Sequence, residues 1–178
     1  MASSCRFCAT PLTTSFADLG MSPLSNAYVA PENAKAMERF YPLHAYVCDG
    51  CHLVQLEEFE TPEAIFSDYL YFSSFAASWV EHARRYAAAM TERFGLTPAS
   101  RVVEVASNDG YLLQWFVQAG IPVLGVEPAA NVAEHARAKG VESVSVFFGE
   151  ATARDLRAKG FAADLMAANN VLAHVPDI

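Results

Sequence analysis

Two short apolar runs, each ending in polar residues, constrain the fold of this chain more than any other feature. Val102–Val105 leads into Ala106–Gly110, a polar turn that closes on glycine, and Val123–Val126 leads into Glu127 and Pro128. Buried parallel strands have this pattern, and the carboxyl ends of such strands form the ligand site of an α/β sheet. The pattern therefore predicts a nucleoside site, with backbone N–H groups at the first turn and a carboxylate for the ribose hydroxyls one strand later.

The chain after Pro98 alternates between strand-like and helix-like segments. We expect strands near 101–106, 122–126, 143–147 and 163–168, and helices near 110–119, 130–139 and 150–159. A glycine follows each helix, where a left-handed residue ends helices at little steric cost (Gly120, Gly140 and Gly160). This order predicts an α/β fold, namely the first half of a Rossmann-like doubly wound sheet with right-handed crossovers.

Residues 1–60 have a different texture, with short irregular segments and frequent prolines. Strand-like pieces at 43–47 and 53–56 flank a C-x-x-C pair as the arms of a hairpin would. This stretch has too few apolar positions for a strong core, so we expect a metal ion to hold it together.

The four cysteines form two C-x-x-C pairs, which predict a structural zinc site held by Cys5, Cys8, Cys48 and Cys51. Each C-x-x-C turn places two thiolates on one side of the chain, and two such turns complete a tetrahedron. His44 and His52 lie beside the second pair and are alternative ligands. Free thiols or redox pairs remain as alternatives, although a redox pair normally sits at a strand-to-helix turn.

Residues 61–98 read as a helical connector. Thr61 and Pro62 form a helix start, with threonine as the cap and proline in the first helical position. An aromatic cluster over 69–72 precedes a long helix expected from about Ser73 to Phe94. Its apolar positions recur at spacings of three and four residues, at Phe75, Trp79, Ala83, Tyr86 and Met90.

Charge and hydropathy exclude several classes of partner. The chain has 178 residues, a formal charge of −8 and no cluster of basic residues, so a nucleic acid is not expected as a partner. No apolar stretch reaches the length of a membrane span, so no membrane association is expected. The first residues lack the basic and apolar regions of a secretory signal, and we expect a cytoplasmic protein.

The turn after the first strand distinguishes between two nucleoside cofactors. A dinucleotide site needs the G-x-G-x-x-G pattern, and here only Gly110 fits, beside Ala106, Asn108 and Asp109. Carboxylates near the turn would repel a diphosphate but suit the cationic sulfonium and ammonium groups of S-adenosylmethionine. Phe148, after the third strand, offers an aromatic face for adenine. A generic α/β domain with acids at loop edges is the alternative.

The combined motifs resemble a known family. They are the two C-x-x-C pairs, Asp18-Leu19-Gly20 with Pro23-Leu24-Ser25, Leu53-Val54-Gln55-Leu56, and Glu104 followed by Asn108-Asp109-Gly110. Together they resemble the sugar C-methyltransferases, S-adenosylmethionine-dependent enzymes with an N-terminal zinc-binding domain that act on nucleotide-linked 4-ketosugars. The resemblance covers essentially the whole chain but only the N-terminal portion of such an enzyme.

The resemblance implies three parts: a zinc module over 1–60, a connector with a substrate-facing aromatic segment over 61–98, and an incomplete class I methyltransferase domain over 99–178. Tyr69 and Tyr71 would face the sugar. S-adenosylmethionine would be held by Glu104, Ala106, Asn108, Asp109, Gly110, Glu127, Pro128, Phe148, Asn169 and Asn170.

In the family reaction a proton leaves the carbon next to the ketone, and the enolate attacks the methyl group. The resemblance thus implies a C-methyltransferase acting on a nucleotide-linked, dTDP-type 4-keto-deoxysugar, with this chain as a truncated form. The general base is expected beyond Ile178, so no catalytic residue is assigned. The alternatives are a non-catalytic zinc- and cofactor-binding module, completed by a partner chain or a C-terminal domain, and an RNA methyltransferase, which the acidic charge disfavours.

Overall fold

The computed structural model describes residues 3–175 and 177–178, and these form two compact units. One unit contains the N-terminal residues up to Ile65 together with Leu172–Ile178, and the other contains Phe66–Val171. Each unit has its own sheet and its own core, and each is described by itself below. No helix in the described part of the chain is both long enough and apolar enough to cross a membrane.

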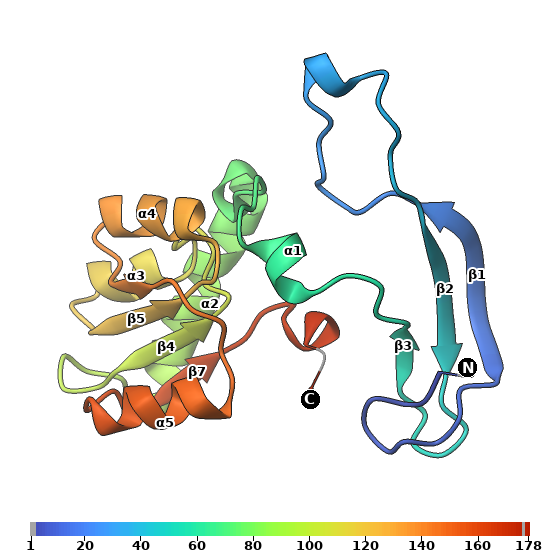
Figure 1. Ribbon diagram of the computed structural model, residues 1–178. Helices are drawn as coiled ribbons and strands as arrows, with labels where there is room; N and C mark the ends of the chain where they lie inside the picture. The colour runs from blue at the N-terminus through green and yellow to red at the C-terminus, as the bar shows by residue number, and fades with distance from the viewer. Residues whose placement is uncertain (1–2, 176) are drawn as a thin grey trace. The chain divides into compact units, whose positions relative to one another are not determined.

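The N-terminal unit contains an antiparallel sheet of β1 (Thr14–Ser22), β2 (Tyr41–Val47) and β3 (Val54–Leu56), in that order (Figure 1). Strands β2 and β3 pair as a hairpin around the second cysteine pair, which confirms the predicted hairpin. Strand β1 was not predicted, because most of its side chains are exposed and its sequence does not alternate between apolar and polar residues.

The core of this unit is built on its cysteines. Cys5, Leu12 and Cys48 are its buried apolar residues, with Tyr46, Cys51 and Leu53 packed against them. A cluster of this size buries little apolar surface, so a bound metal ion would contribute a large share of the unit's stability.

The second unit contains a parallel sheet in the order β6-β5-β4-β7. Its strands are β4 (Val102–Val105), β5 (Val123–Val126), β6 (Ser143–Val144) and β7 (Leu165–Ala167). From β4 the chain moves outward to β5 and β6, and then returns across the sheet to β7 on the other side of β4. The strand order therefore reverses between β4 and β7, which is where ligands bind in sheets of this kind.

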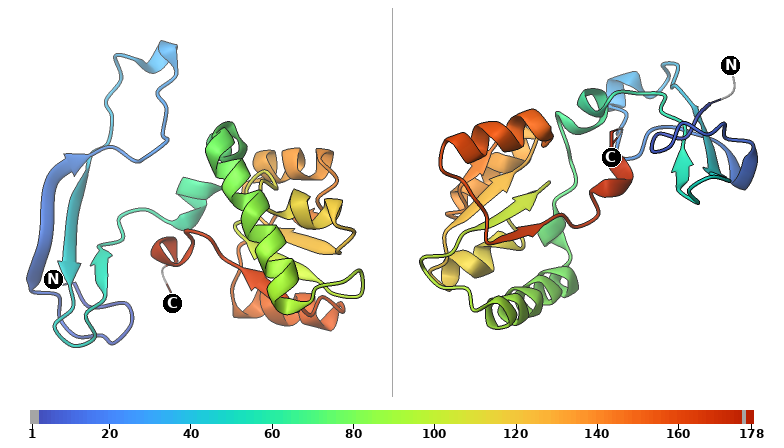
Figure 2. Two further views of the ribbon diagram at one scale, coloured as in Figure 1. Left: turned by 180° about the vertical axis from the view of Figure 1, so that it is seen from behind. Right: turned by 90° about the horizontal axis from the view of Figure 1, so that it is seen from below.

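Helices cover both faces of this sheet, as Figure 2 (right) shows for α2 and α5. On one face, Leu113 and Phe116 of α3 (Leu113–Gln118) pack with Ala83 and Ala87 of α2 (Ala77–Phe94) and with Ala136 of α4 (Ala130–Ala138). On the other face, Leu156 of α5 (Glu150–Ala158) packs on Val103 and Leu124. The predicted α/β class is confirmed, and Gly120, Gly140 and Gly160 have positive φ after their helices as predicted.

Two predictions need correction. The long helix α2 begins at Ala77 rather than near Ser73, because Ser73 and Ser74 form hydrogen bonds to the turn after β4 and Ala76 is extended. Residues 73–75 form a short 3-10 helix instead, and Phe75 is 78% exposed. Strand β6 has two residues rather than the five expected over 143–147. The short helix α1 (Pro62–Phe66) begins at Pro62 as predicted.

The turn between β4 and α3 contains left-handed residues that are not glycine. Ala106 has a φ of 52° and Asn108 a φ of 50°. Asparagine tolerates this conformation, whereas in alanine the Cβ atom comes too close to the following carbonyl oxygen, at a cost of about 1 kcal/mol. Ala106 is therefore a strained residue in an otherwise buried turn.

The strain at Ala106 predicts that Ala106→Gly stabilises the second unit. We expect its free energy of unfolding to rise by about 0.5–1 kcal/mol, since glycine adopts positive φ without the Cβ contact. Urea unfolding followed by tryptophan fluorescence measures this unit alone, because both tryptophans, Trp79 and Trp115, lie within Phe66–Val171. The matched control is Ala88→Gly on the exposed face of α2, which should destabilise by about 1 kcal/mol. If Ala106→Gly destabilised the unit as much as Ala88→Gly does, the inference that Ala106 is strained would be wrong.

Candidate functional site

The two cysteine pairs adopt the same backbone conformation. In each pair the first cysteine accepts a hydrogen bond from the amide four residues later, from Ala9 to Cys5 and from His52 to Cys48, both at 2.9 Å. Each first cysteine also donates its amide to the carbonyl five residues later. Ala9 and His52, which follow the second cysteines, both have positive φ. The pairs are therefore two equivalent knuckles, and cysteine pairs of this spacing are typical of structural zinc sites.

The four thiol groups converge on one point. Their sulfur atoms lie within 4.8 Å of one another, with 3.6 Å between Cys5 and Cys51 and 3.5 Å between Cys8 and Cys48. Zinc–sulfur bonds of about 2.3 Å in a tetrahedron place thiolates about 3.8 Å apart. The donor set and its spacing thus fit zinc. His44 is not part of this group, because its ring nitrogens contact Ser15 and Tyr46.

Gln55 supports this cluster from strand β3. The side chain is buried, its Nε2 donates to Cys5 Sγ at 3.2 Å, and its Oε1 accepts from the Arg6 amide at 3.0 Å. Desolvation raises the pKa of Cys5, but the hydrogen bond from Gln55 and those from the knuckle backbone lower it to about 6. A lower pKa favours the thiolate that binds zinc. Sequence reasoning missed Gln55, although it is a polar residue inside an apolar strand next to the knuckle.

In the second unit, Glu127 joins the two parts of the predicted cofactor edge. It lies directly after β5 and is 5% exposed. Its Oε2 accepts from the Asn108 amide and its Oε1 from the Ala129 amide, both at 2.9 Å. Burial raises the pKa of Glu127, partly offset by these two N–H groups. Each carboxylate oxygen can accept a second hydrogen bond, so two ribose hydroxyls could still bind there.

Glu104 lies at the point where the strand order reverses. It is fully buried in β4, paired with Gly125 of β5 on one side and with Ala167 of β7 on the other. Asn169, just after β7, donates to its Oε1 at 3.4 Å, whereas Oε2 has no hydrogen-bond partner among the described residues. Desolvation raises the pKa of Glu104 well above its usual range, despite hydrogen bonds with Asn169 and Tyr111.

The turn after β4 contains two more buried polar atoms without a partner in the described part of the chain, Ser107 Oγ and Asp109 Oδ1. Asp109 Oδ2, by contrast, pairs with Lys139 at 2.8 Å and accepts a hydrogen bond from Ser74. Lys139 therefore balances the charge of Asp109. Among the described residues, the buried carboxyl of Glu104 has no basic partner of this kind.

The remaining predicted residues lie at different places around this edge. Phe148 is half-buried against the apolar cluster under α5. Asn169 contacts Glu104, and Asn170, with a φ of 54°, follows it. Pro128 is half-buried beside Glu127, and Gly110 closes the turn with a φ of 76°. Tyr69 and Tyr71 lie in a segment that hydrogen-bonds to Asn131 and Asn108, so this segment meets the same edge.

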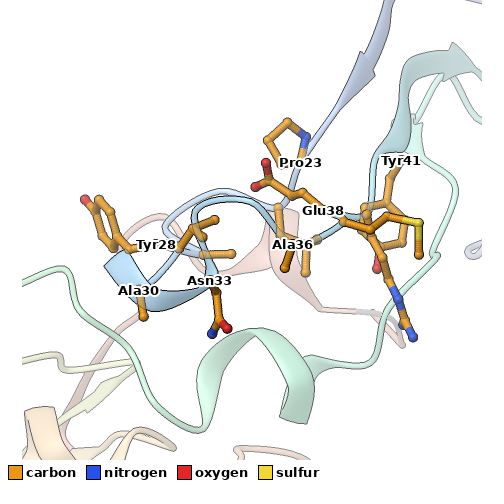
Figure 3. Close-up of a pocket in the computed structure, with 12 residues that line it drawn as sticks. Pro23, Tyr28, Ala30, Asn33, Ala36, Glu38 and Tyr41 are labelled. Carbon is orange, nitrogen blue, oxygen red and sulfur yellow. The ribbon is translucent and has the colours of Figure 1, made fainter.

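The structure contains one hollow away from the predicted site residues and a smaller one beside the partners of Glu104. One of about 450 Å³ lies in the loop between β1 and β2, lined by residues such as Pro23, Tyr28 and Tyr41 (Figure 3). None of the cysteines or predicted cofactor residues line it. The other, of about 20 Å³, lies between Trp79, Tyr111 and Asn169. It has room for about one water molecule beside the partners of Glu104.

Comparisons with known proteins agree with this arrangement. A family model described as "Putative zinc binding domain" matches residues 5–66, and one described as "Methyltransferase domain" matches residues 79–178. The chain belongs to the methyltransferase-domain family. The family matches and the four-cysteine cluster confirm the predicted order, a zinc-binding module followed by a methyltransferase domain.

The chain is 34% identical to the C-methyltransferase NovU of Streptomyces niveus over 174 residues, which cover 98% of this chain and 41% of NovU. Among solved structures it is similar to SAM-bound CalS10, an amino pentose methyltransferase from Micromonospora echinaspora involved in calicheamicin biosynthesis. The identity is 25%, the overlap covers 43% of this chain and 35% of CalS10, and the TM-score is 0.33. YjhP of E. coli is 16% identical, with 47% and 29% covered and a TM-score of 0.27.

Gln55 gives the first prediction from this site. Gln55→Leu keeps the volume of the side chain but removes both hydrogen bonds, so we expect zinc affinity to fall about 10–100-fold. Competition with a chromogenic chelator of known zinc affinity measures the change. The matched control is Val54→Thr on the exposed side of the same strand, which should retain wild-type affinity. Wild-type affinity in Gln55→Leu would show that Gln55 does not support the thiolates.

Glu104 gives the second prediction. Unfolded chains release this proton above a pKa of about 4.3, whereas the folded unit retains it to higher pH. Raising the pH from 5 to 8 should therefore destabilise the ligand-free wild type relative to Glu104→Gln, by up to about 1.4 kcal/mol per pH unit. Urea unfolding at several pH values, followed by tryptophan fluorescence, measures the difference. The control is Glu142→Gln, which removes an exposed carboxylate. If the free energy of unfolding changed with pH in the same way in wild type and Glu104→Gln, the raised pKa of Glu104 would be wrong.

Proposed function

We propose that this chain binds S-adenosylmethionine at the carboxyl ends of β4 and β5 and forms the methyl-donor part of a C-methyltransferase. The observation that carries the proposal is Glu104, a fully buried carboxyl at the reversal of strand order, with one oxygen unpartnered among the described residues. A carboxyl in this state favours a ligand that brings a positive charge. The similarity to a C-methyltransferase along nearly the whole chain supports the same assignment.

The residues of the edge divide between the parts of the cofactor. Glu127 would bind the ribose hydroxyls, Glu104 and Asn169 would lie toward the cationic methionine end, and Phe148 toward adenine. The turn 106–110, together with Pro128 and Asn170, would complete the binding edge. When bound, S-adenosylmethionine supplies a methyl group on a positively charged sulfur, ready for transfer to a nucleophile.

The substrate proposal goes one step further. We propose a nucleotide-linked 4-keto-deoxysugar of the dTDP type, methylated at the carbon next to its ketone, with Tyr69 and Tyr71 facing it. The motifs shared with sugar C-methyltransferases support this substrate class. No described residue is assigned the removal of the proton. The chain spans 41% of the length of NovU, so the complete reaction is proposed for the whole enzyme. The boundaries near residues 60 and 98 are part of the same proposal.

Calorimetric titration of the zinc-loaded chain tests the cofactor. We expect S-adenosylmethionine to bind and NAD⁺ not to bind, because the turn lacks the glycines that admit a diphosphate. Glu127→Ala should weaken S-adenosylmethionine binding by about 1.5–3 kcal/mol, the scale of lost hydrogen bonds to a charged group.

Two controls make this titration decisive. Glu142→Ala removes an exposed carboxylate just before β6 and should leave the affinity unchanged. Glu127→Gln keeps one acceptor for the turn and should lose less affinity than Glu127→Ala. No binding of S-adenosylmethionine by the folded, zinc-loaded wild type would refute the proposed function, and wild-type affinity in Glu127→Ala would refute the ribose role alone.

A further inference from the structure

The segment Tyr69–Ser74, here called the strap, is fastened to the methyltransferase sheet by side chains rather than by secondary structure. It runs between α1 and α2, next to α4 in Figure 1. At its first residue, Asn131 of α4 makes two hydrogen bonds: Oδ1 accepts from the Tyr69 amide at 3.4 Å, and Nδ2 donates to the Tyr69 carbonyl at 2.8 Å. The side-chain carboxamide of Asn131 thus holds the backbone of Tyr69 through both its oxygen and its nitrogen.

The side chain of Asn108 holds the strap in a similar way at Tyr71 and Ser73. Its Oδ1 accepts from the Ser73 amide at 2.8 Å, and its Nδ2 donates to the Tyr71 carbonyl at 3.1 Å. Asn108 is 7% exposed, so its side chain is committed to the strap and is not free in solvent. Carboxamides are suited to this role, because a carboxylate offers no donor for a backbone carbonyl.

Further contacts hold the C-terminal half of the strap. Ser74 donates to Asp109, which also pairs with Lys139 at the end of α4. Phe72 packs edge-on against His135 of α4, with 4.7 Å between the ring centroids. The strap therefore contacts the turn after β4 and the length of α4, where it lies against the proposed cofactor edge.

One residue links the strap to that edge. The side chain of Asn108 binds the strap, while its backbone amide donates to Glu127 Oε2 at 2.9 Å. A ligand that binds Glu127 therefore acts on the residue that holds Tyr71 and Ser73. If ligand binding stabilises the strap, then a firmly held strap must favour ligand binding by the same factor.

We propose that Asn108 and Asn131 are positioning residues that fasten the strap to the cofactor edge, so that the order of the strap and the binding of S-adenosylmethionine are linked. The proposal rests on the proposed function for the identity of the ligand. In this role the side chain of Asn108 holds the strap rather than the cofactor, and Asn131 holds it from α4. Through the strap, both residues set the position of the two tyrosines proposed to face the sugar.

Hydrogen exchange resolved at single amides tests the proposal on the zinc-loaded chain. In Asn131→Ala we expect the Tyr69 amide to exchange roughly ten-fold faster than in wild type. Asn131→Asp retains the acceptor and should fall between the two. The alanine favours helix, so α4 itself should remain intact. Glu134→Ala, on an exposed position of the same helix, is the matched control and should exchange as wild type does.

Titration with S-adenosylmethionine completes the test. We expect the cofactor to slow exchange at Tyr69 and Ser73 in wild type, and Asn131→Ala to bind it several-fold more weakly with unchanged zinc content. Unchanged exchange of the Tyr69 amide in Asn131→Ala would show that Asn131 does not hold the strap, and would overturn the proposal. If the Tyr69 amide exchanges faster in Asn131→Ala but the variant binds S-adenosylmethionine with wild-type affinity, then the order of the strap and cofactor binding are not linked. If the wild type binds no S-adenosylmethionine, the proposed function fails and the linkage with it, while exchange in the ligand-free variants still decides whether the asparagines hold the strap.

Discussion

The carboxylate of Glu127 joins the turn after β4 to the start of α4, and the proposed cofactor edge of the second unit depends on this connection. With one oxygen it fixes the amide of Asn108 in the turn after β4, and with the other the amide of Ala129 before α4. The turn is thereby held in a conformation with two left-handed residues, one of which is a strained alanine. The position of the Asn108 side chain, and with it the attachment of the strap, follows from this backbone arrangement.

Charge is distributed unevenly along the same edge. Asp109 has a lysine partner, Glu127 has two backbone N–H groups, and Glu104 has an amide donor on one oxygen only. Burial raises the pKa of Glu104 well above its usual range, so its ionisation is costly in the ligand-free state. A positive charge beside such a carboxyl reduces the cost of its ionisation, which is the physical basis of the proposed preference for a cationic cofactor.

The sequence was sufficient for features that depend on local pattern. The apolar runs at β4 and β5, the glycines after the helices and the two cysteine knuckles each carry a short-range signal, and each lies where it was predicted. The aromatic cluster of the strap was visible in the sequence, but its attachment could not be predicted, because Asn131 and Tyr69 are 62 residues apart and no motif includes Asn131. The same applies to Lys139, which pairs with Asp109 across 30 residues. The long helix was expected to begin near Ser73, but Ser73 and Ser74 instead form a 3-10 turn and hydrogen-bond to Asn108 and Asp109, more than 30 residues away.

The matched geometry of the two knuckles has a consequence for the chain between them. A metal ion bound to both would act as a cross-link between Cys8 and Cys48, and β1, β2 and the loop of Figure 3 lie within the closed loop. Loop-closure entropy grows slowly, by only about 0.6 kcal/mol for each doubling of length. Insertions or substitutions at the hollow between β1 and β2 would therefore cost the zinc site little. This loop is a position where the N-terminal unit can acquire new surface chemistry while its core stays the same.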